Sequence, residues 1–203
     1  MAAEIAIIDY GMGNLYSVSN AFAALGILTD IIGSAERVME YRKLILPGVG
    51  AFGDAMKELN HRGLTAPLRD FAAQGRPFLG ICLGMQLLLD KSQESPRVRG
   101  LGIIPGEARR FSGKLKCPHM GWNKILVKRP GPLFDKLPED IYTYFCHSYY
   151  AVPKDRGSVA GETEYGAAFA SIIHKGSVYG MQFHPEKSQD TGLRLLRNFI
   201  EQC

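Results

Sequence analysis

The spacing of apolar residues divides the chain into two parts of different texture. Up to about residue 90, short apolar runs alternate with segments whose apolar residues recur every three or four positions, which predicts strands alternating with amphipathic helices. The predicted strands span 4–9, 28–32, 43–50 and 77–81. The predicted helices span 14–25, 51–60, 64–74 and 83–90. Strands separated by helices are typical of βαβ units, so this part predicts an α/β fold with a mostly parallel sheet and helices on both faces.

After residue 100 the pattern changes to short β-rich segments with brief connections, which predicts an antiparallel extension in the C-terminal half. These segments are 124–129, 141–146, 158–163, 168–174 and 178–183. An amphipathic helix is predicted over 191–202, with an apolar face formed by Leu195, Leu196, Phe199 and Ile200. Because no linker, repeat or low-complexity tract interrupts the chain, residues 1–203 are expected to form a single domain.

Composition and charge narrow the class of protein. Hydrophobic residues make up 46% and charged residues 22% of the chain, the usual mix for a soluble globular protein. The net charge of +4 comes without a run of Lys or Arg, which argues against nucleic-acid binding. No stretch approaches the roughly 20 apolar residues of a membrane span, and the N-terminus lacks the pattern of a signal peptide. A cytoplasmic protein with no membrane association is expected.

The cysteines limit the chemistry further. Cys82, Cys117, Cys146 and Cys203 are scattered and show no C-x-x-C spacing. This spacing argues against a disulfide framework and against a zinc site. No metal or other cofactor is expected.

The segment GICLG places Cys82 between Gly80 and Gly84, where a predicted strand runs into a predicted helix. This spacing is that of a nucleophile elbow, in which small flanking residues permit a tight, strained turn. A thiol at the start of a helix also has a lowered pKa. A buried core cysteine fits the same five residues equally well, because free cysteines are commonly buried.

A cysteine nucleophile needs a base, and His184 has the most suitable setting of the five histidines. It follows a predicted strand in YGMQFHPEKS, and Glu186 lies two residues further on. If the strands before Cys82 and His184 are parallel, both residues lie at the carboxyl end of the sheet, where ligands bind in such folds. Glu186 would then orient the imidazole, giving a Cys-His-Glu triad. The alternative is a turn histidine that precedes a proline.

The loop PGVG at 47–50 supplies a candidate oxyanion hole. Its residues Gly48, Val49 and Gly50 can leave backbone N–H groups free to face a ligand, and the N–H of Leu83 would add a further donor. A plain turn between strand and helix fits the loop as well.

Together these motifs resemble the class I (triad) glutamine amidotransferases. GICLGMQ, FHPEKS and LPGVG match that family's motifs in the family's order, and their spacing covers the whole chain. The resemblance implies a flavodoxin-like doubly wound sheet and hydrolysis of L-glutamine to glutamate and ammonia through a thioester on Cys82, with His184 as base and Glu186 as its partner. It also implies substrate-binding roles for Gln86, Glu94, Ser148 and Tyr149.

Further strings resemble one branch of this family, whose members pass ammonia to a separate cyclase in histidine biosynthesis. These strings are PHMGWN at 118–123, YFCHSYY at 144–150 and IIDYGMGN at 7–14. The resemblance implies a heterodimer with a cyclase subunit that is a (β/α)8 barrel, because a barrel needs about 250 residues of its own. It places the partner interface at Asn14, Ser17, Met120, Trp122, Asn123, Tyr144 and Lys187. The only tryptophan is also compatible with a core position, and His119 and His147 receive no catalytic role.

Other interpretations of the chain remain open from sequence. A glutaminase that serves a different synthase shares the elbow and the FHPE motif. A cysteine-dependent hydrolase or redox protein of similar fold is a further class, although redox chemistry favours a resolving cysteine nearby. A catalytically inactive binding subunit predicts the loss of Cys82, His184 or Glu186, and all three are present.

Overall fold

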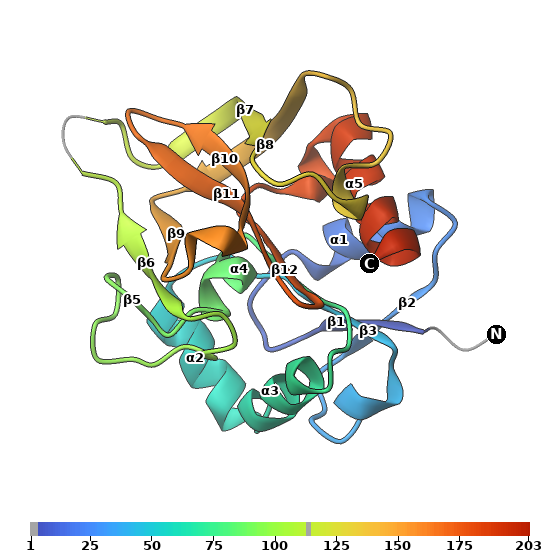
Figure 1. Ribbon diagram of the computed structural model, residues 1–203. Helices are drawn as coiled ribbons and strands as arrows, with labels where there is room; N and C mark the ends of the chain where they lie inside the picture. The colour runs from blue at the N-terminus through green and yellow to red at the C-terminus, as the bar shows by residue number, and fades with distance from the viewer. Residues whose placement is uncertain (1–3, 113–114) are drawn as a thin grey trace.

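Short apolar strands that pair in parallel form the centre of the computed structural model, which describes residues 4–112 and 115–203 (Figure 1). Their order across the sheet is β2-β1-β3-β4-β12. Their bounds are Ile5–Ile8 for β1, Thr29–Ile32 for β2, Lys43–Leu46 for β3, Phe78–Ile81 for β4 and Val178–Met181 for β12. All residues of β1, β4 and β12 are buried, as expected for strands covered on both faces. This is the strand order of a flavodoxin-like sheet, so the predicted fold class is confirmed.

Helices cover both faces of these strands. Their bounds are Leu15–Ala24 for α1, Phe52–His61 for α2, Thr65–Ala73 for α3, Leu83–Leu87 for α4 and Gln189–Gln202 for α5. Because successive strand residues point to opposite faces, the sheet separates two apolar cores. Ile7 packs in a cluster with Phe22 of α1 and Phe199 of α5, whereas Ile8 belongs to the cluster that contains residues of α2 and α3. Figure 1 accordingly shows α1 beside α5 and α2 beside α3.

The C-terminal half adds antiparallel strands to the sheet beyond β12. These are β6 (Gly106–Arg110), β7 (His119–Val127), β8 (Ile141–His147), β9 (Tyr149–Pro153), β10 (Val159–Glu164) and β11 (Ala168–Lys175). The path continues as β12-β11-β10-β7-β8, while β9 pairs with β11 and β6. The predicted antiparallel extension is therefore present.

Several details differ from the sequence-based expectation. The segment predicted at 178–183 belongs to the parallel group as well, because β12 is antiparallel to β11 but parallel to β4. Strands β6 and β9 and the two-residue β5 (Lys91–Ser92) were not predicted. The sequence of β6, GEARR, lacks both an apolar run and apolar alternation, and its pairing with β9 defines it as a strand. Strand β7 begins at His119 rather than 124, and α4 ends at Leu87 rather than 90.

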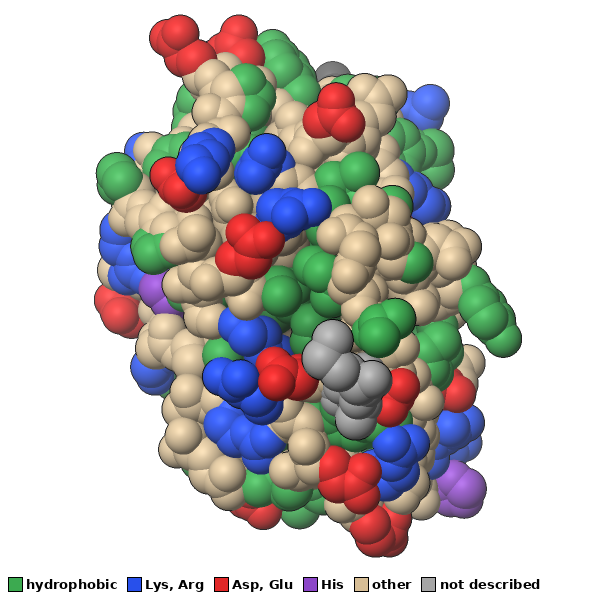
Figure 2. All heavy atoms as spheres, turned by 90° about the vertical axis from the view of Figure 1, so that its right-hand side faces the viewer, with side chains coloured by type: hydrophobic (Ala, Val, Ile, Leu, Met, Phe, Trp, Pro, Cys, Tyr) green, Lys and Arg blue, Asp and Glu red, His purple; other side chains and the backbone are tan. Residues whose placement is uncertain are grey.

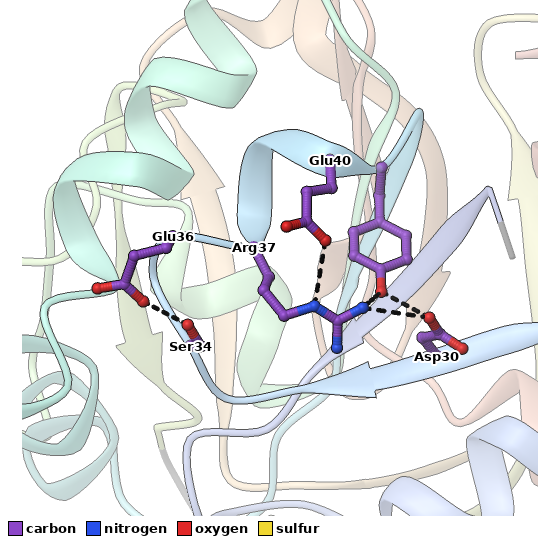
Figure 3. Close-up of polar contacts among 6 residues, drawn as sticks. Asp30, Ser34, Glu36, Arg37 and Glu40 are labelled. Carbon is purple, nitrogen blue, oxygen red and sulfur yellow. Dashed lines mark hydrogen bonds and ion pairs between the residues drawn. The ribbon is translucent and has the colours of Figure 1, made fainter. Parts of the chain in front are cut away.

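The edge strand β2 is tied to the following short 3-10 helix, Val38–Glu40, by a polar network (Figure 3). The Arg37 guanidinium lies 3.4 Å from Asp30 Oδ2 and 3.1 Å from Glu40 Oε2. Tyr41 donates its hydroxyl to Asp30 Oδ2 at 2.6 Å, and burial together with this bond raises the pKa of Tyr41 to about 12. A second short contact joins Ser34 to Glu36. These contacts join the segment around the 3-10 helix to the exposed edge strand β2.

The surface beside this edge carries interspersed acidic and basic side chains, with no large field of one sign (Figure 2). Within the described part of the chain, no helix combines the length and apolar character needed to cross a lipid bilayer. Over the same residues, no cluster of three or more His, Cys, Asp or Glu side chains forms a candidate metal site. All four cysteines are free thiols.

Candidate active site

Cys82 occupies a strained turn between β4 and α4. Its backbone has φ +54° and ψ −109°, a left-handed region that residues with a side chain rarely adopt. Both flanking glycines are required by close backbone contacts. A Cβ on Gly80 would lie 2.7 Å from the carbonyl carbon of Gly84, and a Cβ on Gly84 would lie 1.8 Å from the Leu46 carbonyl oxygen. The turn therefore has the geometry of a nucleophile elbow.

His184 lies beside Cys82 because the two preceding strands are parallel neighbours. Met181 at the end of β12 is in register with Ile81 at the end of β4, so both chains leave the sheet at the same edge. The two residues line one cavity. His184 follows the elbow by about 100 residues in the sequence, and the parallel pairing of β4 with β12 brings the two together.

Glu186 fixes the orientation of the imidazole. His184 Nδ1 lies 2.8 Å from Glu186 Oε1, and these two side chains are 8% and 2% exposed. Nδ1 therefore donates to the carboxylate, which leaves Nε2 for exchange with the thiol. Burial by itself lowers the pKa of His184, but hydrogen bonds to Cys82 and Glu186 and the negative charges of both groups outweigh burial and raise it. This environment favours the charged imidazolium form of His184.

The thiol has two further polar neighbours that sequence reasoning missed. Cys82 Sγ lies 4.0 Å from the Cys146 carbonyl oxygen, and the Gln182 amide nitrogen donates to Sγ at 3.9 Å. Gln182 is fully buried although its side chain is polar, and it directly follows the buried strand β12. An amide at that position, two residues before His184, is the sequence signal for it.

A cavity of about 350 Å³ opens at the thiol. It brings together all four predicted substrate-binding residues, Gln86, Glu94, Ser148 and Tyr149. Glu94 comes from a loop, and its Oε2 accepts a hydrogen bond from the Phe52 backbone N–H at 2.7 Å, at the start of α2. This bond anchors a carboxylate at the cavity wall, where it can face a cationic group.

The PGVG loop borders the cavity, but its residues have different roles. Val49 and Gly50 line the cavity together with Leu83, and Gly50 has φ +98°. Gly48 lies behind the lining, where a Cβ would be 2.4 Å from the Tyr10 hydroxyl and 3.2 Å from the Gly84 nitrogen.

Tyr10 supports this loop and was not singled out from sequence. Its fully buried hydroxyl donates to the Pro47 carbonyl oxygen at 2.9 Å. Burial, with a smaller contribution from the charge of Cys82, raises the pKa of Tyr10, so the phenol remains a neutral donor.

The residues predicted to face a partner lie on β7 and β8, at the start of α1 and in the turn after β12. Met120 and Trp122 are 62% and 48% exposed on β7, although both are large apolar side chains. Asn14 caps α1 by accepting from the Ser17 N–H at 3.3 Å. Asn14 and Lys187 also line a small space of about 20 Å³ beside Glu186, whose Oε2 has no hydrogen-bond partner among the described residues. The other members are the half-buried Asn123 and Tyr144.

A larger cavity of about 560 Å³ lies at the opposite ends of β4 and β12, between Gly75 and Ser177. Neither cysteine, histidine nor carboxylate side chains are among the residues that line it. The smaller cavity at Cys82 is therefore the candidate active site.

Comparison with known proteins gives consistent results. The family model for glutamine amidotransferase class-I matches residues 6–203. The chain is 50% identical to the imidazole glycerol phosphate synthase subunit HisH of Moorella thermoacetica over 197 residues, covering 97% of this chain and 94% of that protein. It is also 50% identical to the HisH subunit of Sulfurimonas denitrificans over 202 residues, covering 97% of each. A crystal structure of a glutamine amidotransferase superposes with a TM-score of 0.78 at 20% identity, over 98% of each chain, which shows the shared fold.

Proposed function

This chain belongs to the glutamine amidotransferase class-I family, and we propose that Cys82, His184 and Glu186 are the triad with which it hydrolyses L-glutamine to glutamate and ammonia. One observation carries the assignment of the triad. Cys82 sits in a strained elbow beside an imidazole whose Nδ1 is bound by a buried carboxylate at 2.8 Å. A buried core cysteine requires neither the strain nor the paired imidazole.

The reaction follows from this arrangement. His184 Nε2 takes the thiol proton of Cys82, and the sulfur attacks the side-chain amide carbon of glutamine to form the tetrahedral oxyanion. Collapse of this intermediate breaks the C–N bond as His184 Nε2 gives its proton to the leaving nitrogen, which departs as ammonia. His184 then removes a proton from water, and the resulting hydroxide attacks the thioester and releases glutamate. Glu186 keeps the imidazole in the required tautomer and stabilises its positive charge.

The cavity walls provide the contacts that such a substrate needs. The Glu94 carboxylate suits the α-ammonium group, and the backbone at Ser148 and Tyr149, together with Gln86, suits the rest of the amino acid. The N–H groups of Leu83, Val49 and Gly50, which line the cavity, are the oxyanion donors in this proposal, and Gly48 behind them permits the course of the loop. One such donor contributes about 100- to 1,000-fold to the rate.

The close relatives indicate which synthase uses the ammonia. At about 50% identity over nearly the whole chain, they are HisH subunits of imidazole glycerol phosphate synthase, so this chain is a glutaminase subunit that serves histidine biosynthesis. In our proposal its partner is a (β/α)8 cyclase. That cyclase uses the ammonia to make imidazole glycerol phosphate and an aminoimidazole carboxamide ribonucleotide. The exposed Met120 and Trp122, beside the site, support a docking face there.

Glutamate release by the purified chain tests the proposal, measured alone and with a cyclase subunit and its nucleotide ligand. Cys82→Ala is expected to abolish release while the fold and cyclase binding persist. Cys203→Ala is the matched control, because that thiol lies at the end of the chain, outside the cavity. Normal turnover in Cys82→Ala would exclude the triad. Turnover that depends on Cys82 but ignores the cyclase would assign the chain to another branch of the family.

A further inference from the structure

Two buried histidines that the proposed reaction does not use face each other across β7 and β8. His119 and His147 are opposite in the strand register, and they are 3% and 5% exposed. His119 Nδ1 lies 3.0 Å from His147 Nε2. Aromatic rings enclose the pair, namely Phe111, Phe145, Tyr165 and Phe169. A hydrogen bond between two imidazoles in such surroundings fixes where each proton must lie.

The proton positions follow from the groups at both ends of the pair. His147 Nδ1 lies 2.8 Å from the Tyr149 carbonyl oxygen, which only accepts, so Nδ1 carries the proton and Nε2 accepts. His119 Nδ1 must then donate to His147, which leaves His119 Nε2 as an acceptor. Asn123 Nδ2 lies 3.3 Å from that nitrogen.

The amide orientation of Asn123 is set independently. Its Nδ2 donates to the Glu164 carbonyl oxygen at 2.9 Å, and its Oδ1 accepts from the Lys124 N–H at 2.8 Å. The amide group therefore presents a donor to His119, in agreement with the proton positions derived from Tyr149. Both histidines are neutral with hydrogen on Nδ1. Burial keeps them so, because it lowers the pKa of His119 and lowers that of His147 to about 3.

The Tyr149 carbonyl oxygen links the two histidines to further hydrogen bonds that lead toward Cys82. Gln86 Nε2 donates to Tyr149 O at 2.9 Å and to Gln182 Oε1 at 3.2 Å. This leaves Gln182 Nε2 to face Cys82 Sγ at 3.9 Å. Every donor and acceptor from Asn123 to the thiol is thus compatible with a single arrangement of protons. In that arrangement the last group, the Gln182 amide, presents a hydrogen to the Cys82 sulfur.

We propose that Asn123, His119 and His147 are positioning residues of the glutaminase site: they hold the Tyr149 carbonyl, and through Gln86 they orient the Gln182 amide that donates to Cys82. That this series of hydrogen bonds affects turnover rests on the proposed function. The series itself is a property of the folded protein and can be tested without glutamine.

The proton positions are tested by NMR on the full chain labelled with ¹⁵N at histidine. Two-bond nitrogen–hydrogen correlations distinguish the two neutral tautomers from the charged form. The signals of His119 and His147 are assigned by their loss in His119→Asn and His147→Asn. Both residues are expected as neutral Nδ1–H tautomers at pH 7. An Nε2–H tautomer or an imidazolium at either residue would overturn the proposal.

The link to the thiol is tested by the pH dependence of Cys82 alkylation with iodoacetamide, followed by mass spectrometry of the peptide that contains Cys82. His119→Phe keeps an aromatic ring in the cluster but leaves His147 Nε2 without its donor. The alkylation rate at pH 7 is expected to fall about fivefold, the size of one net hydrogen bond, with the profile displaced to higher pH. His119→Asn restores a donor near the position of Nδ1 and is expected to recover part of the rate.

Tyr165→Phe is the matched control. It keeps the ring that stacks on His119, with the two ring centroids 4.1 Å apart, and removes only the hydroxyl. That hydroxyl donates to the Lys116 carbonyl oxygen, which takes no part in the series of hydrogen bonds that leads to Cys82. Its alkylation profile is expected to match that of the wild type. A wild-type profile in folded His119→Phe would overturn the proposal. Since alkylation requires no glutamine turnover, this failure differs from failure of the proposed function, which shows as absent glutamate release by the wild type.

Discussion

Replacement of Gly84 by alanine tests the structural basis of the elbow most directly. The added Cβ would lie 1.8 Å from the Leu46 carbonyl oxygen and 2.9 Å from the Leu46 carbonyl carbon. Contacts of Cβ atoms below 3.0 Å are essentially never observed, so β3 and the start of α4 must separate by more than 1 Å. Both neighbours are backbone, because Leu46 ends β3 and Gly84 lies in the first turn of α4. Rotation of a side chain therefore cannot relieve the contact.

The expected cost follows from the rigidity of these neighbours. Overpacking a core typically costs about 1–3 kcal/mol, and a backbone contact belongs at the upper end, so Gly84→Ala is expected to lower the free energy of unfolding by about 3 kcal/mol. That is a large share of the roughly 5–15 kcal/mol available to a typical domain. The separation also displaces Cys82 and the Leu83 N–H. A shift of about 1 Å costs on the order of 100-fold in rate, which is the fall expected in kcat/KM for glutamine.

Urea unfolding and glutaminase assays measure the two effects, and Gly131→Ala provides the matched control. Gly131 has extended backbone with φ 174°, and no atom lies within 4 Å of the position that a Cβ would take there. Alanine at this position is therefore expected to change stability by less than about 1 kcal/mol. Wild-type stability and activity in Gly84→Ala would refute the close contact between β3 and α4 as the reason for this glycine.

Three further predictions follow from the site. Tyr10→Phe leaves the Pro47 carbonyl without its donor, so urea unfolding is expected to show a loss of about 1–3 kcal/mol and kcat/KM is expected to fall as the loop loosens; unchanged values would remove Tyr10 as its support. Because the pKa of His147 is lowered to about 3, the folded state excludes a proton that the unfolded chain binds below about pH 6.5. The stabilising contribution of neutral His147 is therefore complete above that pH, and on acidification the free energy of unfolding declines by about 1.4 kcal/mol per pH unit. Urea unfolding at about pH 7 and at about pH 5.5 measures this decline, which is expected to be smaller by about 1 kcal/mol in His147→Asn. Trp122→Ala is expected to weaken cyclase binding by about 2 kcal/mol in calorimetry while glutamine hydrolysis by the isolated chain persists, and an unchanged affinity would exclude Trp122 as an interface anchor.

The parts of the fold that the sequence predicts are those in which local pattern and tertiary environment agree. β1 and β4 are apolar runs buried on both faces, and α5 carries its apolar residues at helical spacing. The elbow is predictable for a related reason. Gly80 is needed because Gly84 and Met85 approach it closely in the turn, and this requirement is visible within a few residues, whereas the need for Gly84 comes from the Leu46 carbonyl of β3 and is not local in the sequence.

Features that depend on pairing between distant segments could not be predicted in the same way. His119 and His147 meet because β7 and β8 pair in one particular register, and a shift of one residue would turn one of them to the other face. Gln182 is a polar residue in a buried segment, and its role becomes visible only beside Gln86 and Cys82. Tyr10 acts on a loop 37 residues away in sequence.

The position of β12 shows how local sequence motifs depend on the pairing of distant segments. It is the only strand of the described sheet that pairs in parallel with one neighbour, β4, and antiparallel with the other, β11, along the path from β2 to β8. The elbow follows β4, whereas His184 and Glu186 follow β12, so the nucleophile and its base come together only when the hairpin of β11 and β12 has joined the parallel sheet. The residues of the triad are local motifs, but their meeting requires the non-local pairing of β12 with β4. Assembly of the site therefore depends on the junction between the parallel sheet and its antiparallel extension.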